Sequence, residues 1–104
     1  MTQYSFDASL TQRDIELTTI FMMWLDEHGH IYFSSDLFRE AHLDDGFSDP
    51  QHEIGTYFAK LKVNGVAVAV GEEPSAIASN NRRRVDLFRF DWARWRTILR
   101  SRLT

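Results

Sequence analysis

The segment over residues 34–90 constrains the fold most, because its helix and strand signals follow one another in a fixed order. A short helix is expected over about 35–43 and a longer one over 50–63. Valines that alternate with alanines predict a strand over 66–70, and a β-prone run predicts a second strand over 85–90. A polar loop that ends in arginines separates the two strands. The expected order is therefore helix, turn, helix, strand, loop and strand.

Cap signals support both helices. Ser34 or Ser35 can cap the first, and Ser48 has capping-box spacing with Gln51 before the second. A glycine at position 65 predicts a left-handed end for the second helix. The buried side of this helix is expected to hold residues that recur at i, i+3, i+4 and i+7: Ile54, Tyr57, Phe58 and Leu61.

An earlier helix is expected to start at the capping pair Thr11 and Asp14 and to run to about His28, where a glycine would end it. One apolar stripe is expected on it, made of Leu17, Ile20, Phe21, Trp24 and Leu25. A short β-prone run over 30–33 follows. Before this helix, residues 1–10 show no sustained period and are expected to form a flexible arm.

Length and charge limit the alternatives. A chain of 104 residues suits one domain, here expected over 11–104, and the absence of cysteine excludes disulfides and thiolate metal sites. Residues 1–53 carry eleven acidic and two basic side chains, whereas residues 54–104 carry four acidic and ten basic ones. This asymmetry favours one face for a polyanion, although the two halves could instead attract each other within the fold. The longest apolar run is too short to span a bilayer.

The element order, together with the segment IGTYFAKLKVNGVAVAV, resembles the winged helix-turn-helix family over about residues 11–90. The implied fold class is α+β, with a three-helix core, a two-stranded hairpin wing whose loop covers 71–84, and an extra C-terminal helix over 91–103. More loosely, the serines and asparagines of the loop and its closing RRRVDLFRF look like small winged-helix proteins of phages and mobile elements.

The resemblance implies that the helix over 50–63 lies in the major groove of DNA. By the 100° step of a helix, the side opposite its buried stripe carries small or polar residues that allow a close approach to bases. An ordinary solvated helix face is the alternative. The DNA-binding residues expected on or beside this helix are Ser48, Gln51, His52, Gly55, Thr56, Ala59, Lys60 and Lys62.

The wing is expected to bind the minor groove or its phosphates, although a solubilising turn would have a similar composition. Its expected DNA-binding residues are Ser79, Asn80, Asn81, Arg82, Arg83 and Arg84. Since side chains alternate along a strand, at most two of the arginines can reach DNA, and one would pair with Asp86 or Glu72. Free N–H groups at the helix starts near Ser34, Ser35 and Ser48 could hold further phosphates.

The last helix has two possible roles. Its stripe of Trp92, Trp95 and Leu99 either packs back on the domain or forms a homodimer interface. Catalysis is not expected, because His28 and His30 have no third ligand in view and no phosphate-binding glycine loop, HExxH or GxSxG motif is present. No cofactor, metal, membrane or small-molecule substrate is implied.

The sequence therefore predicts a sequence-specific protein that binds double-stranded DNA in the cytoplasm, at the nucleoid, most simply as a transcriptional regulator. A replication, partition or excision factor of a mobile element is a variant of this interpretation. The competing interpretation is a protein-interaction module on the same fold, favoured by the acidic pI of 5.7.

Overall fold

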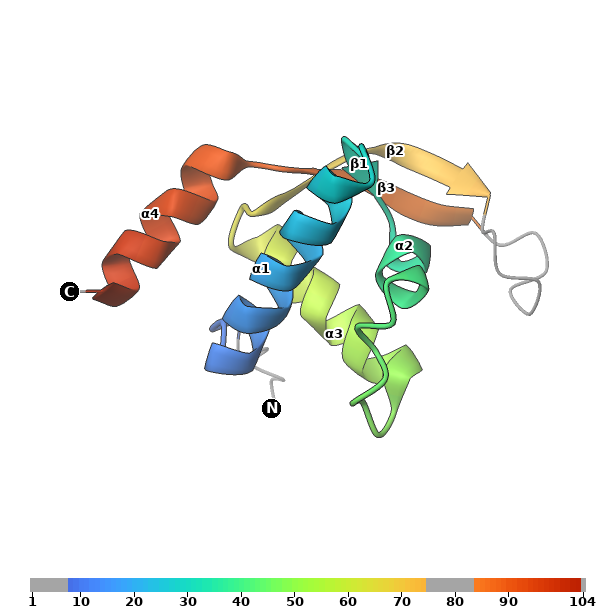
Figure 1. Ribbon diagram of the computed structural model, residues 1–104, viewed down its shortest axis with the longest axis horizontal. Helices are drawn as coiled ribbons and strands as arrows, with labels where there is room; N and C mark the ends of the chain where they lie inside the picture. The colour runs from blue at the N-terminus through green and yellow to red at the C-terminus, as the bar shows by residue number, and fades with distance from the viewer. Residues whose placement is uncertain (1–7, 75–83, 104) are drawn as a thin grey trace, which may run out of the picture.

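The computed structural model describes residues 8–74 and 84–103, which form an α+β arrangement (Figure 1). Helices pack beneath one side of a small antiparallel sheet whose strand order is β1-β3-β2. The elements are α1 (Gln12–Glu27), β1 (Tyr32–Phe33), α2 (Ser35–Glu40), α3 (Pro50–Val63), β2 (Ala67–Pro74), β3 (Arg84–Phe90) and α4 (Trp92–Leu103). None of the helices in this described part has both the length and the apolar composition needed to cross a membrane.

The core is built around aromatic rings. Phe21 of α1 is fully buried, and its ring meets Phe33 of β1 and Phe38 of α2 edge to face, with centroids 5.3 and 5.2 Å apart. Phe33 in turn stacks on Phe90 of β3 at 4.3 Å, and Phe58 of α3 completes the cluster. Aromatic pairs in these geometries stabilise a core beyond the burial of their area. The cluster fixes α1, α2, α3 and the sheet relative to one another.

The start of α1 is confirmed, whereas its expected stripe is partly wrong. Thr11 and Asp14 form the capping box, because each side chain bonds the backbone N–H of the other residue. Ile20, however, is 51% exposed, while Met22 is 3% exposed and lies in the core. The helix carries two neighbouring apolar stripes, and the periodicity of the sequence cannot tell which of them faces the core.

The connection from α2 to α3 differs from the expected one. α2 ends at Glu40 rather than near residue 43, and turns cover 41–46. The expected Ser48–Gln51 capping box is wrong, because Asp49 is the N-cap. The Glu53 carboxylate instead accepts hydrogen bonds from the Asp49 N–H at 2.8 Å and the Ser48 hydroxyl at 3.4 Å. The bond from the Asp49 backbone is the main cause that lowers the pKa of Glu53.

The prediction of the buried side of α3 is confirmed: the helix buries Ile54, Tyr57, Phe58 and Leu61. The helix ends at Val63 with Asn64 as its C-cap, and Gly65 supplies the expected left-handed residue, with a φ of +76°.

The hairpin strands are longer than the sequence suggested. Residues 71–74 pair with residues 84–87, so the expected loop over 71–84 is wrong at both ends. A register shift between Ala69 and Gly71 interrupts the alternation and leaves Val70 44% exposed. The regular alternation of valines in the sequence does not indicate such a bulge.

The two ends of the described chain pack against each other. Asp91 caps α4 by accepting a bond from the Arg94 N–H at 3.0 Å, and the side chain of Arg102 donates to the Leu10 carbonyl. Leu10 is only 5% exposed, and the Ala8 carbonyl accepts a bond from the side chain of Asn64. The expectation of a flexible arm is therefore wrong for residues 8–10, and the rest of that arm, residues 1–7, lies outside the described residues.

Candidate nucleic-acid interface

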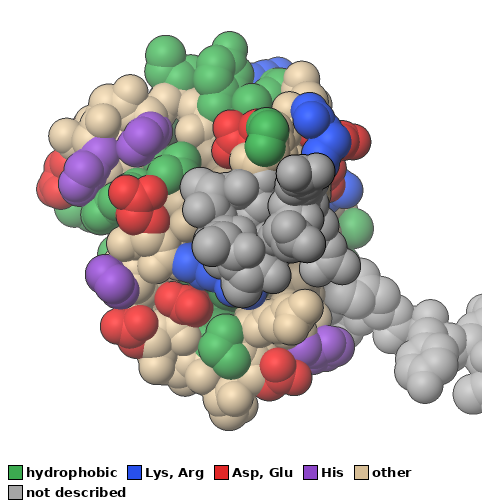
Figure 2. Space-filling view, turned by 90° about the vertical axis from the view of Figure 1, so that its right-hand side faces the viewer, with side chains coloured by type: hydrophobic (Ala, Val, Ile, Leu, Met, Phe, Trp, Pro, Cys, Tyr) green, Lys and Arg blue, Asp and Glu red, His purple; other side chains and the backbone are tan. Residues whose placement is uncertain are grey.

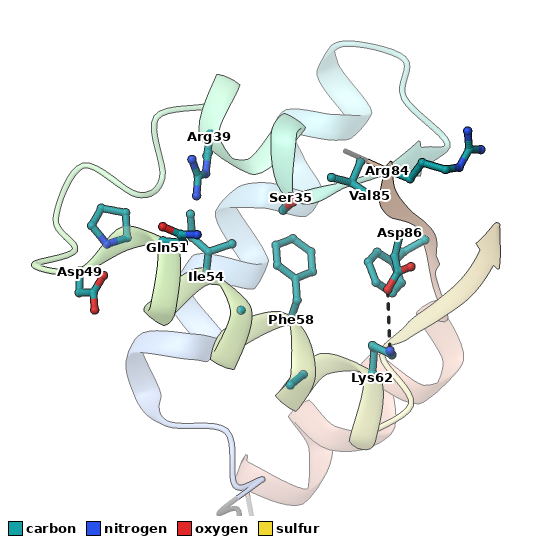
Figure 3. Close-up of a pocket in the computed structure, with 14 residues that line it drawn as sticks. Ser35, Arg39, Asp49, Gln51, Ile54, Phe58, Lys62, Arg84, Val85 and Asp86 are labelled. Atoms are coloured by element: carbon teal, nitrogen blue, oxygen red, sulfur yellow. Dashed lines mark ion pairs between the residues drawn. The ribbon is translucent and has the colours of Figure 1, made fainter. Parts of the chain in front are cut away.

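A groove of about 1080 Å³ runs along one side of α3, between this helix, the start of α2 and β3 (Figure 3). Ile54 and Phe58 of α3 line it from the buried side of the helix. Three residues expected to bind DNA, Gln51, Gly55 and Ala59, line it from the more open side. With Lys62, the groove therefore contains four of the seven α3 residues selected from the sequence.

Three cationic side chains line this groove, each from a different element: Arg39, Lys62 and Arg84. Lys62 Nζ lies 4.0 Å from the Asp86 carboxylate, and Arg84 Nε lies 3.2 Å from the Glu72 carboxylate. All four side chains are about half exposed. Exposed pairs of this kind contribute about 0–1 kcal/mol, so an incoming phosphate can replace the carboxylate.

Arg39 was not selected from the sequence, and it forms no ion pair with any described residue. Only the fold of the 41–49 connection places it opposite Gln51, so the sequence carries no local signal for it. Figure 3 shows both side chains at the same end of the groove, beside Asp49.

The other side of α3 faces α1. His52, Thr56 and Lys60 line a smaller cavity of about 370 Å³ there. Since they line this cavity and not the groove, His52, which is exposed, and Thr56, which is half-buried, lie apart from the groove residues. Lys60 Nζ lies 3.1 Å from the carboxylate of Asp14 of α1, and the two side chains are only 16% and 11% exposed. The expectation that Lys60 is free to reach a phosphate is therefore wrong, because α1 already supplies its anion.

A hydrogen-bonded chain extends this contact inward. The Thr18 hydroxyl donates to the Asp14 carbonyl at 2.7 Å. Because that hydroxyl has only one proton, the Tyr57 hydroxyl donates to Thr18 Oγ1 at 2.6 Å. Burial raises the pKa of Tyr57 well above its ordinary value. This chain and the Lys60–Asp14 pair form a polar contact between α1 and α3, called the α1–α3 seam below.

The helix starts do not offer the phosphate sites suggested by the sequence. Ser34 is fully buried, and α2 is only six residues long. Beside Ser48, the Asp49 N–H is occupied by the Glu53 carboxylate, whose charge would repel a phosphate. Ser35 is half-buried and lines the groove. The serines at the helix starts therefore add little to the interface.

The hairpin is described only in part. Ser79, Asn80, Asn81, Arg82 and Arg83 lie outside the described residues. Figure 2 shows acidic and basic side chains interspersed on the described surface at the hairpin end of the molecule. The basic residues of α4 lie at the opposite end of the molecule in Figure 1. The expectation that the positive charge gathers on one side is therefore not met by the described residues.

The three residues expected at a dimer interface, Trp92, Trp95 and Leu99, also differ in their exposure. Trp95 is 4% exposed and belongs to the core, so it is not available to a second copy. Leu99 is half-buried, and Trp92 is 54% exposed.

His28 and His30 both stack on Trp24, at 4.3 and 5.7 Å. Within residues 8–74 and 84–103, no cluster of three or more metal-ligating side chains is present.

No protein-family model, curated protein or solved structure matches this chain.

Proposed function

We propose that this chain is a winged helix-turn-helix domain that binds double-stranded DNA. The proposed contact places α3 in the major groove and the β2–β3 hairpin on the adjacent backbone or minor groove. The single observation that carries the proposal is the open side of α3, where Gln51, Gly55 and Ala59 line a groove bordered by cations from α2, α3 and β3. The element order, with a hairpin directly after the exposed helix, also supports it.

Each part of the groove suits a different part of a duplex. A Cβ placed on Gly55 would meet no atom within 4 Å, so the surface is open at this point and a base edge can approach the helix closely. The amide of Gln51 can form paired hydrogen bonds with adenine. Lys62 and Arg84 are placed to bind phosphates on either side, which would orient the helix without reading sequence.

The carboxylates of Asp86 and Glu72 limit the affinity. Each must give up its cation, or be screened, before a phosphate can bind. We therefore expect modest affinity for each copy, with a steep dependence on salt. In a cell, such a domain would act as a regulator at sites in chromosomal DNA, with arginines 82 and 83 of the hairpin adding further charge.

The same two ion pairs favour a second candidate function, a protein-interaction module. Paired charges give a nearly neutral surface, which suits a protein partner better than a polyanion. The two candidates predict opposite results for variants in the groove.

The test measures fluorescence anisotropy of labelled duplexes at several salt concentrations. Lys62→Met should weaken binding about 3–10-fold and lower the salt slope by about one, because one phosphate contact is lost. Asp86→Asn should tighten binding about 2–5-fold, since Lys62 is then released to the phosphate.

Arg89→Met is the matched control. Like Lys62→Met, it removes one positive charge. Arg89, however, lies on the face of β3 opposite to Phe88 and Asp86, so its effect on DNA binding should be small. If wild type and all three variants bind DNA equally weakly, the interaction module is the better account.

A further inference from the structure

The outward side of α1 carries an apolar pair between two acids. Glu16, Ile20, Met23 and Glu27 are spaced i, i+4, i+7 and i+11, so they lie on one face of the helix. All four are exposed, and Ile20 and Met23 expose 51% and 59% of their surface. We call these four residues the α1 stripe. An isoleucine and a methionine so exposed on one helix face make an apolar surface that lacks a partner within the described chain.

α4 carries a similar stripe with the opposite charge. Trp92, Arg96, Leu99 and Arg100 are spaced i, i+4, i+7 and i+8, and we call them the α4 stripe. Trp92 is 54% exposed, both arginines are exposed and Leu99 is half-buried. Trp95 is buried, and Ile98 and part of Leu99 pack against the core, so these three residues hold α4 on the domain while Trp92 and the two arginines stay exposed.

Neither set of charges is neutralised within the described residues. α4 contains four arginines and no acid. Two of them, Arg94 and Arg102, donate to backbone carbonyls, whereas Arg96 and Arg100 form no ion pair with a described residue. The carboxylates of Glu16 and Glu27 also have no cationic partner in this part of the chain. Each stripe therefore presents exposed apolar groups beside charges of one sign.

We propose that these stripes bind a second copy of this chain, with α4 of each copy lying on α1 of the other. The residues of the α1 stripe span about 16 Å along the helix and those of the α4 stripe about 12 Å, so the α4 stripe is short enough to lie along the α1 stripe. The arginines of α4, about 6 Å apart along the helix, lie near the glutamate at one end of the α1 stripe, and the tryptophan and leucine lie against its isoleucine and methionine. In the proposed dimer the contact forms twice, with α4 of each copy on α1 of the other, and a two-fold axis relates the two contacts.

The position of this interface leaves the groove free. In Figure 1, α4 lies at the opposite end of the molecule from the open end of the β2–β3 hairpin. The dimer therefore does not rest on the proposed DNA contact. If both hold, two copies of α3 would be presented to one duplex, which compensates for modest affinity per copy.

The test uses the whole chain and two charge-reversed variants, analysed by sedimentation equilibrium in low salt. A first variant carries R96E and R100E, and a second carries E16R and E27R. Wild type should be a dimer at about 100 µM, a concentration above the roughly micromolar dissociation constant expected of a small interface. Each variant alone should be monomeric. An equimolar mixture should form a 1:1 heterodimer, since both of its α1–α4 contacts then join opposite charges.

Matched controls reverse charges outside the stripes. R89E on β3 and E40R on α2 alter exposed residues and should leave the wild-type dimer unchanged. Circular dichroism checks that every variant is folded. A monomeric wild type, variants that dimerise as well as wild type, a mixture that stays monomeric, or open-ended assembly of the wild type would each overturn the proposal. None of these results depends on whether the chain binds DNA.

Discussion

The two sides of α3 carry lysines two residues apart that have different surroundings. Lys60 is mostly buried and lies 3.1 Å from an equally buried carboxylate on α1. Lys62 is half exposed and lies 4.0 Å from a half-exposed carboxylate on β3. Charge pairs in poor contact with water are costly to break, whereas exposed pairs exchange partners easily. The comparison assigns the α1–α3 seam to the stability of the fold and leaves the groove side available for a ligand.

The largest expected difference between the two sides is in stability. Asp14→Ala removes the partner of Lys60 and half of the α1 capping box, so it should lower the free energy of unfolding by about 2–3 kcal/mol. Asp86→Ala removes the matching carboxylate from the groove side and should change it by less than about 0.5 kcal/mol. Urea denaturation of both variants measures the difference. Equal losses would contradict the distinction between the seam and the groove.

A smaller effect is expected within the seam. Tyr57→Phe should lower the free energy of unfolding by about 1 kcal/mol, because Thr18 loses a donor while its own bond to the Asp14 carbonyl remains.

The raised pKa of Tyr57 also gives the sign of a pH effect. Above about pH 10 the unfolded chain loses the phenol proton while the folded chain keeps it, so wild type should lose stability with rising pH relative to Tyr57→Phe. Urea midpoints of the two proteins between pH 8 and 11 would test this, and parallel pH profiles would contradict it.

A small stabilising effect is expected at Gly55, on the groove side. Gly55→Ala should raise the free energy of unfolding by about 0.5–1 kcal/mol, because alanine favours the helix and its Cβ meets no atom within 4 Å. If DNA approaches α3 closely here, the same variant should bind duplexes less well despite its higher stability. Thermal unfolding and anisotropy on one protein sample would separate the two effects. Tighter binding together with higher stability would count against a close approach.

Local signals in the sequence were sufficient for much of the fold. The Thr11–Asp14 capping box, the glycine at 65 and the buried stripe of α3 depend on residues a few positions apart, and all were predicted. The side of α1 that faces the core was not predicted, because Ile20 and Met22 both fit apolar stripes.

Less of the candidate site was predictable. Four of the residues selected on or beside this helix line the groove together, namely Gln51, Gly55, Ala59 and Lys62. His52, Thr56 and Lys60, which were expected on the same face as Gly55 and Ala59, line the cavity on the other side. The partner of Lys60 on α1 and the position of Arg39 depend on how distant elements pack, and helical periodicity carries no information about either. One arginine of the hairpin was expected to pair with Asp86 or Glu72, and Arg84 does pair with Glu72, while Asp86 lies beside Lys62.

The most direct test of the proposed DNA contact is an NMR titration of the labelled chain with a short duplex in low salt. We predict that the largest amide shift changes fall on Gln51, Gly55, Ala59 and Lys62 and on the start of β3, with small changes over the middle of α1. Changes centred on α1 and α4, or no changes at saturating duplex, would contradict the assignment of the groove side of α3 to DNA.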